Sequence, residues 1–468
     1  MSKRVLALYD FASKQEFIYR TSKIKEISGA SELLSCIYKK LVDEINKSQR
    51  FNLIYNIEEN FCFQDFENDD TRDGEVLYDG GGNLMVLYRD KETYKAVNRI
   101  ISVYLLKNVP TLHMIASCVD VQGDFEKDRK RLYHQNRINK NLFPSYELSA
   151  VTPMTQTDPM TFLPIVHKDL KSEQSLSADR FAKQKAYDWK KNKETNDLDN
   201  LQGLTAVIYI DGNSMGKKLT KCSDSNYDEG VKKLRKFSFE VNRDFVEEPL
   251  RQLKDYSFSS KHKGFRQVIG GGDEITIICD AKIALELVFK YFEALESTNE
   301  DKEDEDKNYS CAGIAVFHAK APFAVAYEIA EAACESAKKK AHKVNGNYFD
   351  FYFCHASITT DFDTLRAREQ SISMRPYKYE EAKELFEKYS TILQAAGRSN
   401  VKALGNAAQE SRAKYSFEVN RVNAYIGRKD ALEANKEKNQ DEIRLIYDMS
   451  EFYDLWFAKE AGKDEKES

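Results

Sequence analysis

The feature that most constrains this chain is a repeated pattern, a buried strand that ends in aspartate and is followed at a distance by a glycine-rich hairpin. The first copy has its strand at residues 4–10 and its hairpin turn at 80–83. The second has its strand at 204–211 and its hairpin turn at 270–274. In each copy a helix precedes the hairpin, and a helix and a further strand follow it. This β-α-β-β-α-β order predicts an α+β chain with two ferredoxin-like domains.

The length of 468 residues suits two or three domains. We expect a first ferredoxin-like domain at 1–140, a helical linker at 141–200, a second ferredoxin-like domain at 201–360 and a small helical domain at 361–468. Prolines and lysines mark the linker, and apolar positions at helical spacing mark the C-terminal domain. The two ferredoxin-like domains are expected to pack pseudosymmetrically.

Composition excludes several classes of protein. The 71 basic and 76 acidic side chains give a net charge of −5, so the chain as a whole does not attract nucleic acid or anionic membranes. The longest apolar runs are too short to cross a bilayer, and the N-terminus does not resemble a signal peptide. The eight cysteines occur singly, which predicts reduced thiols and no zinc ribbon. We expect a cytoplasmic protein that does not bind membranes.

The second repeat carries acidic residues at two places. Asp273 and Glu274 lie on the hairpin, and Asp211 ends the first strand. Because that strand is central in a ferredoxin-like sheet, we expect Asp211 to face the hairpin carboxylates. Carboxylates about 4 Å apart repel each other by roughly 4 kcal/mol per pair unless a cation neutralises them. We therefore expect these three side chains and the Gly212 carbonyl to bind two Mg²⁺ or Mn²⁺ ions.

A nucleoside triphosphate such as ATP is the expected substrate of this site. Gly271 and Gly272 would let the triphosphate approach the hairpin backbone, and Lys338 would bind its phosphates. The same lysine also suits the end of a helix, where it interacts with the helix dipole. Two metals beside a triphosphate predict attack of a 3′-hydroxyl on an α-phosphate with release of pyrophosphate. A Gly-Gly-Asp-Glu hairpin is also a common surface turn, so a non-catalytic role stays open.

The first repeat lacks the hairpin carboxylates. Asn83 and an apolar residue take their places, and of the expected ligands only Asp10 is retained. The first repeat therefore cannot form a two-metal site. We expect it to serve as a partner of the second, with Gly81 and Gly82 binding an acceptor nucleotide.

Five segments, in this order along the chain, resemble the large polymerase/cyclase subunit of type III CRISPR effector complexes. They are residues 15–34, 78–83, 211–219, 271–274 and 312–315. The resemblance implies tandem palm domains, the first of them degenerate, and synthesis of cyclic oligoadenylates from ATP in antiviral signalling. It also implies an RNA-guided effector complex as partner.

The chain departs from that family's pattern at several points. We expect it to start at the first palm, without the histidine–aspartate nuclease domain that many members carry, and residues 152–160 contain no zinc-binding cysteines. Glu274 stands where the family has aspartate, and Asn213 replaces another aspartate. These differences indicate a divergent member of the family.

Three other functions stay open. A diguanylate cyclase has a similar hairpin, although Ile275 here replaces its phenylalanine. A non-catalytic scaffold could use the acidic hairpin only to sense nucleotides. RNA binding would rest on the basic segment 127–140 and the lysines near 183–193. RNA, an effector complex and further copies of this chain are the macromolecular partners to consider.

Overall fold

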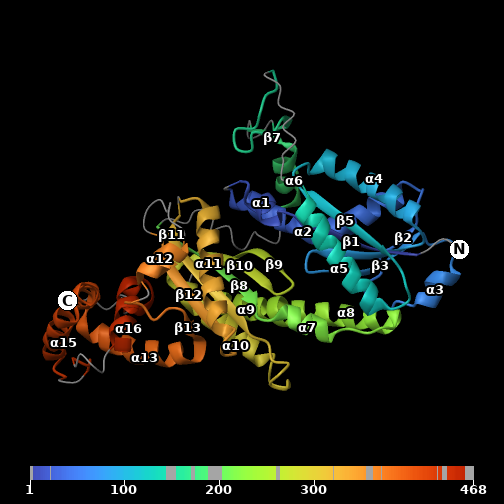
Figure 1. The fold of residues 1–468 in the computed structure, drawn as a ribbon. Coiled ribbons are helices and arrows are strands. Elements are labelled where there is room, and N and C mark those ends of the chain that lie inside the picture. The colour runs from blue at the N-terminus through green and yellow to red at the C-terminus, as the bar shows by residue number, and fades with distance from the viewer. Residues whose placement is uncertain are drawn as a thin grey trace. The chain divides into compact units, whose positions relative to one another are not determined.

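The structure is a computed structural model (Figure 1). It describes residues 4–21, 23–143, 154–169, 174–187, 203–259, 264–319, 321–354, 362–369, 371–428, 431–434 and 440–458. The lysines at 190–193, which the sequence offers as RNA ligands, lie outside the described residues. The chain forms two compact units that do not follow its linear order. The first comprises Met1–Asp199, Ser214–Glu248 and Gln267–Ile275, and the second Asn200–Asn213, Pro249–Arg266 and Thr276–Ser468.

A five-stranded sheet in the order β2-β3-β4-β1-β5 is the centre of the first unit. Its strands are β1 (Val5–Ala12), β2 (Leu53–Ile54), β3 (Gly74–Gly80), β4 (Asn83–Tyr88) and β5 (His113–Asp120). Strand β1 is antiparallel to both of its neighbours, β4 and β5. The longer helices α2 (Ile24–Lys47) and α4 (Lys91–Asn108) occupy the two predicted positions, and α1 (Lys14–Tyr19) and α3 (Phe63–Asn68) are short. The predicted β-α-β-β-α-β order of the first palm is confirmed.

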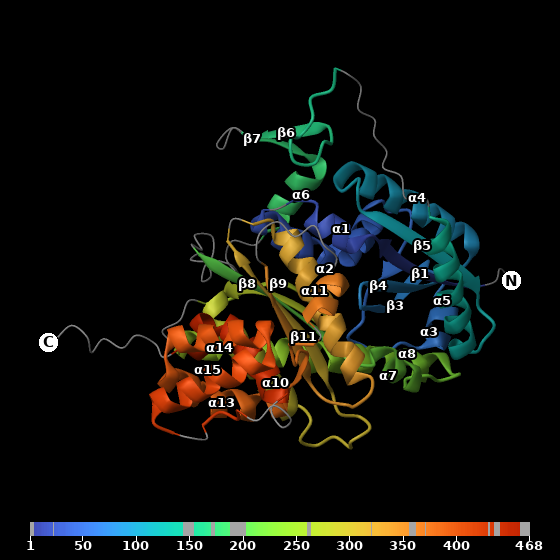
Figure 2. The ribbon, with the colours of Figure 1, turned by 60° about the vertical axis from the view of Figure 1, so that its left-hand side comes forward.

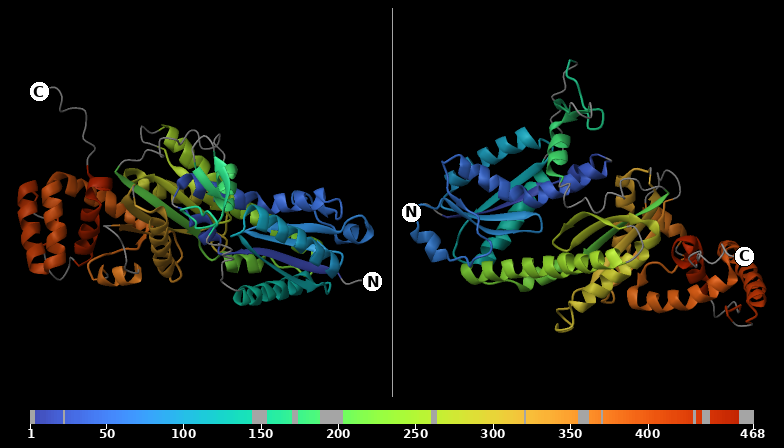
Figure 3. Two further views of the ribbon diagram at one scale, coloured as in Figure 1. Left: turned by 90° about the horizontal axis from the view of Figure 1, so that it is seen from above. Right: turned by 180° about the vertical axis from the view of Figure 1, so that it is seen from behind.

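Helices cover both faces of this sheet (Figures 1 and 3). Because side chains alternate along a strand, neighbouring residues of β1 pack in different layers. Tyr9 contacts helix α4, whereas Leu6 and Leu8 belong to a buried cluster with helices α5 (Phe125–Leu142) and α8 (Tyr227–Asn242). Helix α8 follows the first strand of the second repeat in the chain, yet it packs in the core of the first unit.

The described part of the predicted linker is folded. It contains a two-stranded sheet and a helix, β6 (Ile165–Asp169), β7 (Gln174–Ser177) and α6 (Ala178–Ala186). Helix α6 packs on α2, where a Cβ atom at Gly29 would lie only 2.8 Å from the carbonyl carbon of Lys183. The buried guanidinium of Arg180 binds both Glu26 and Asp158 at 2.9 Å. The pair with Glu26 attaches the segment to α2, and the pair with Asp158 holds the segment together.

A six-stranded sheet in the order β13-β12-β11-β8-β10-β9 forms the second palm. Its strands are β8 (Leu204–Gly212), β9 (Arg266–Gly271), β10 (Glu274–Asp280), β11 (Ser310–His318), β12 (Tyr348–Phe353) and β13 (Tyr377–Lys378). The order β11-β8-β10-β9 repeats the order β5-β1-β4-β3 of the first palm. The helices between its strands in the chain are α7 (Met215–Lys221), α8, η2 (Arg243–Glu247), α9 (Glu248–Ser259), η3 (Ala281–Ile283), α10 (Ala284–Ser297) and α11 (Phe323–Ala341), of which α7, α8 and η2 belong to the first unit. The tandem palm fold is thereby confirmed.

The C-terminal region is helical, as predicted (Figure 2). Its helices are α12 (Phe362–Glu369), α13 (Tyr379–Ala396), α14 (Arg398–Glu410), α15 (Arg412–Ile426), α16 (Gln440–Glu451) and η4 (Tyr453–Phe457). Aromatic side chains pack this region against the sheet. The ring centroid of Phe351 on β12 lies 6.0 Å from that of Tyr377, in a stacked arrangement, and 5.2 Å from that of Trp456, in an edge-on arrangement. Of the helices that the structure describes, none is both long enough and apolar enough to span a membrane.

Candidate active site

Asp211 is the penultimate residue of β8, a strand that is buried from Thr205 to Ile210. Its Cα is in register with that of Cys311 on β11. Tyr209, two residues earlier and thus on the same face of the strand, contacts Tyr327 of α11 with ring centroids 5.5 Å apart. The Asp211 side chain is 21% exposed and lies on the face that α11 covers.

Lys338, in the last turn of α11, forms an ion pair and a hydrogen bond with the Asp211 carboxylate. It also lies 3.2 Å from Glu335. Burial lowers the pKa of the Lys338 ammonium, but the negative charge of Asp211 outweighs burial, and the pKa is raised overall. Lys338 is therefore protonated at neutral pH and neutralises Asp211.

Gly313 allows this pairing because it brings α11 close to β11. A Cβ atom at Gly313 would lie 2.5 Å from the backbone nitrogen of Cys334 and closer still to the carbonyl oxygen of Ala330. Any side chain there would push the helix away from the strand. The sequence signals this residue only through the 312–315 resemblance, which says nothing of helix packing.

The residues after Asp211 are held by backbone contacts. Asn213, which follows Gly212, donates its backbone N–H to the Tyr309 carbonyl at 2.8 Å. Its side-chain amide donates a hydrogen bond to the Gly346 carbonyl at 3.4 Å. Asn213 thereby holds the loop before β12 against the end of β8. The proposed metal ligation by the Gly212 carbonyl stays a prediction.

The tip of the second hairpin belongs to the first unit. Gly272 has a φ of +66°, which favours glycine, and the Cβ position of Gly271 points into open space. A Cβ atom on Gly272 would lie 3.9 Å from the Cα of Gly81, so the two hairpin tips are neighbours within this unit. Burial raises the pKa of the Tyr78 hydroxyl, and the nearby charge of Asp273 adds to the rise. Gly81 and Gly272, one from each predicted hairpin, therefore lie close together.

In the first palm, lysine side chains of the same palm bind the residues that correspond to Asp211 and to the hairpin glycines. The Asp10 carboxylate pairs with Lys14 at 3.1 Å and with Lys140. The carbonyl oxygen of Gly82 accepts hydrogen bonds from Lys14 at 2.9 Å and from the Tyr38 hydroxyl at 2.8 Å. Sequence reasoning missed these lysines, because nothing in the spacing of Lys140 relates it to Asp10.

Within the described ranges, no three or more His, Cys, Asp or Glu side chains lie close enough together to hold a metal ion. Carboxylate oxygens are the hard ligands that Mg²⁺ and Mn²⁺ prefer. The chemistry of the predicted donors therefore fits these ions, although a metal at Asp211 would share that carboxylate with Lys338. The two-metal centre of Asp211, Asp273 and Glu274 stays a prediction.

Residues 204–346 match the family model of the second palm domain of Cas10/Cmr2. The chain carries a Cas10-type palm. No curated protein matches its sequence. The motif resemblance to the large subunit of type III CRISPR complexes is confirmed, and the chain is Cas10-like.

Solved structures show the same fold over most of the Cas10-like chain. The apo Csm1–Csm4 cassette matches with a TM-score of 0.57 and 14% identity, over 95% of this chain and 68% of that one. Csm1 in T. onnurineus gives a TM-score of 0.57 and 13% identity, over 95% and 68%. In the Csm1–Csm4 cassette bound to cA3, with a TM-score of 0.50 and 14% identity, the match covers 83% of this chain and only 58% of that one. At such identities the likeness shows the fold.

Proposed function

We propose that this Cas10-like chain is a metal-dependent nucleotidyltransferase that joins ATP or related nucleoside triphosphates into a linear or cyclic oligonucleotide messenger. The observation that carries the proposal is that the second palm alone retains acidic residues at both places, Asp211 at the strand end and Asp273 and Glu274 on the hairpin. Structures of Csm1–Csm4 cassettes contain cA3, cA4 and AMPPNP, which supports an adenine nucleotide as substrate.

The first palm supports the expected meeting of these carboxylates. There the register places Asp10 opposite Asn83. By the sequence repeat, Asn83 corresponds to Asp273, and Asp10 corresponds to Asp211. Strands β8 and β10 are neighbours in their sheet, as β1 and β4 are. The same register in the second palm would place Asp211 opposite Asp273.

Each residue then has a defined task. Asp211, Asp273, Glu274 and the Gly212 carbonyl would hold two Mg²⁺ or Mn²⁺ ions, which when bound supply charge neutralisation on the triphosphate and activation of the attacking hydroxyl. Lys338 would donate hydrogen bonds to phosphate oxygens. The 3′-oxygen of an acceptor forms a bond to the α-phosphorus, and the bond from that phosphorus to pyrophosphate breaks.

The first palm would hold the acceptor. A nucleotide would bind beside the turn at Gly81 and Gly82, and Gly81, whose Cβ position lies 3.7 Å from the Tyr78 hydroxyl, neighbours Gly272 of the second hairpin. At Gly82 the nucleotide would have to displace the Lys14 ammonium. Cytoplasmic residence and assembly into an effector complex, as in the Csm1–Csm4 structures, are part of the proposal.

The test is incubation of the purified chain with each NTP and Mg²⁺ or Mn²⁺, with products read by mass spectrometry. We expect an oligonucleotide from the wild type and from Asp304→Ala, a matched change in an exposed loop, and none from Asp273→Ala. ATP binding with and without metal is measured in parallel. An absence of both product and metal-dependent ATP binding in the wild type would contradict the proposal.

A nucleotide-sensing scaffold is the second candidate. It is favoured by the pairing of Asp211 with Lys338 and by the absence of a three-carboxylate cluster from the part of the chain that the structure describes. A scaffold would bind ATP without metal and yield no product. The match of 204–346 to Cas10/Cmr2 favours either reading over a diguanylate cyclase.

RNA binding on the basic segment gains little support from the structure. Most of its cations already have partners on their own unit. These pairs are Lys127–Asp124, Arg129–Ser223, Lys130–Glu126, Arg131–Asp128, Arg137–His134 and Lys140–Asp10. RNA phosphates would have to compete with these contacts.

A further inference from the structure

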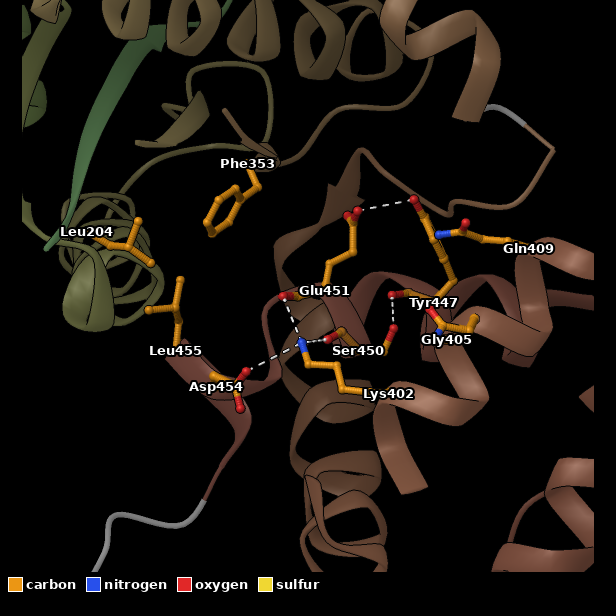
Figure 4. A pocket seen from close by; sticks show the side chains of 11 residues that line it. Leu204, Phe353, Lys402, Gly405, Gln409, Tyr447, Ser450, Glu451, Asp454 and Leu455 are labelled. Carbon is orange, nitrogen blue, oxygen red and sulfur yellow. Dashed lines mark hydrogen bonds and ion pairs between the residues drawn. The ribbon is translucent and has the colours of Figure 1, made fainter. Parts of the chain in front are cut away.

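A cavity of about 370 Å³ lies in the second unit, away from Asp211 along the sheet and at the junction with the C-terminal helices (Figure 4). The ends of β8 and β12 form one side of it, through Leu204 and Phe353. Helices α14 and α16 form the other side. Its volume lies near the lower end of the range of about 300–1,000 Å³ for small-molecule sites.

One face of each helix lines the cavity. The lining positions recur every three or four residues, at Lys402, Asn406 and Gln409 on α14 and at Tyr447 and Glu451 on α16. The helices approach closely where a Cβ atom on α14 would overlap α16: at Gly405 it would lie 2.7 Å from the Ser450 Cβ. Gly405 and Ser450 both line the cavity, so the two helices meet at its wall.

The two sides differ in polarity. Figure 4 shows Leu204, Phe353 and Leu455 on one side and Lys402 and Glu451 on the other. The apolar side, with the Phe353 ring among its groups, suits a flat and poorly solvated ring.

The charges on the polar side are already compensated. Lys402 lies 3.5 Å from Asp454 and donates to the Ser450 carbonyl at 2.6 Å. The guanidinium of Arg398 lies 2.7 Å from Asp454, and that of the buried Arg375 lies 3.2 Å from Glu451. A charged ligand would have to break one of these pairs, so the cavity favours an uncharged one.

Two amides at the rim have unused hydrogen-bonding capacity. Asn406 and Gln409 are exposed, and neither side chain has a hydrogen-bond partner among the residues that the structure describes. Each amide offers a donor and an acceptor, which matches the paired donors and acceptors on the edge of a nucleobase.

We infer that this cavity binds an uncharged nucleoside. Its base packs against Phe353, Leu204 and Leu455, and Asn406 and Gln409 bind its polar edge or its ribose hydroxyls. A nucleotide is excluded by charge, because Lys402 is the sole cation among the lining residues and Asp454 already pairs with it. The inference does not depend on the proposed transferase.

The test uses the full chain and two readouts. Calorimetric titration with adenosine, guanosine, cytidine and uridine measures affinity, and 8-azidoadenosine photolabelling with peptide mapping locates the site. At least one nucleoside should bind, and label should fall on peptides from 402–409 or 447–455. Gln409→Leu should weaken binding by about tenfold or more, whereas Ser399→Leu, on the same helix but outside the lining, should not.

Two further binding measurements distinguish nucleoside binding in this cavity from binding at the predicted catalytic site. Nucleoside binding should persist in Asp273→Ala and should not be displaced by ATP. Binding of no nucleoside, binding of ATP or spermidine alone, or label confined to peptides of the hairpin 266–280 would each overturn the inference. Circular dichroism confirms that Gln409→Leu is folded, and Asn406→Leu serves as the independent second variant.

Discussion

The two palms share a fold and a strand-end aspartate but differ in what neutralises it. Ser13 and Ser214 both have left-handed backbone, with φ of 52° and 61°, and each stands three residues after its aspartate. The next residue is Lys14 in the first palm and Met215 in the second. Lys14 binds both the strand-end carboxylate and the hairpin carbonyl of its palm. The second palm has no ammonium at this position.

The second lysine is common to both palms. Lys140 and Lys338 each pair with the aspartate of their palm, and each stands fifteen residues after the first residue of its helix, Phe125 or Phe323. Helices α5 and α11 follow corresponding strands, so the repeat extends by one helix beyond the predicted order. Lys14 is therefore the added cation of the first palm. The comparison teaches that the same strand-end aspartate has two ammonium partners in the first palm and one in the second, which leaves room for the proposed metal only in the second.

The largest effect is expected from Met215→Lys, which gives the second palm the cation of the first. The new ammonium should compete with metal for Asp211, and product formation should fall by at least about a hundredfold, since even outer-shell changes at metal sites cost about 10–100-fold. Pyrophosphate release with ATP and Mg²⁺ measures the loss. Met215→Leu is the matched control and should stay within a few-fold of wild type. Equal rates for the two variants would break the comparison.

A smaller effect is expected from Lys338→Met, which removes the lysine that both palms share. Charge-assisted hydrogen bonds contribute about 1.5–3 kcal/mol, so kcat/KM for ATP should fall by roughly 10–100-fold. Lys338→Arg keeps the charge and should recover part of the loss. Steady-state kinetics over a range of ATP concentrations checks this, and an unchanged kcat/KM in Lys338→Met would show that the lysine does not contact the substrate.

The substitution Gly313→Ala should lower the free energy of unfolding. The corresponding residue of β5 is Ser117, whose hydroxyl lies 3.1 Å from the Asn136 amide oxygen on α5, whereas Gly313 lets α11 touch the strand directly. Overpacking costs about 1–3 kcal/mol of unfolding free energy, measured by urea denaturation. Gly216→Ala is the control, because its Cβ would meet nothing within 4 Å. A Gly313→Ala variant as stable as Gly216→Ala would contradict this account of helix packing.

The smallest effect is expected from Lys140→Met in the first palm. The Lys140 side chain is 43% exposed and Asp10 retains Lys14, so the unfolding free energy should fall by no more than about 1 kcal/mol. Product formation should not change. If Lys140→Met reduced turnover as strongly as Lys338→Met, the first palm would take part in catalysis, which would contradict this comparison.

Local patterns were enough to predict the four strands that the two sheets share, because a strand that ends in aspartate and a glycine hairpin such as 80–83 are each specified by adjacent residues. They did not predict β12 and β13, which extend the second sheet. The sequence did not predict the packing of 154–187, whose Arg180 pairs with Glu26 across 154 positions of the chain. The same limit applies to α8, which joins the first unit through contacts such as Tyr227 with Asp128. Apolar periodicity shows that a helix is amphipathic but not which sheet it covers.

The sequence pointed to the separate residues of the candidate site but not to all of their contacts. The aspartate, the hairpin and Lys338 follow from motif order, and the structure pairs Lys338 with Asp211. The roles of Lys14 and Gly313 did not follow, because a hydrogen bond from a lysine to a distant backbone turn and a helix–strand contact depend on the folded chain.

The most direct test of the central claim compares Mn²⁺ binding in two matched variants, Asp211→Asn and Asp10→Asn, by electron paramagnetic resonance in the presence of AMPPNP. This measurement needs no turnover. We expect wild type and Asp10→Asn to bind Mn²⁺ alike and Asp211→Asn to lose that binding. Retention of Mn²⁺ by Asp211→Asn, or its loss from Asp10→Asn, would contradict the assignment of the metal to the second palm.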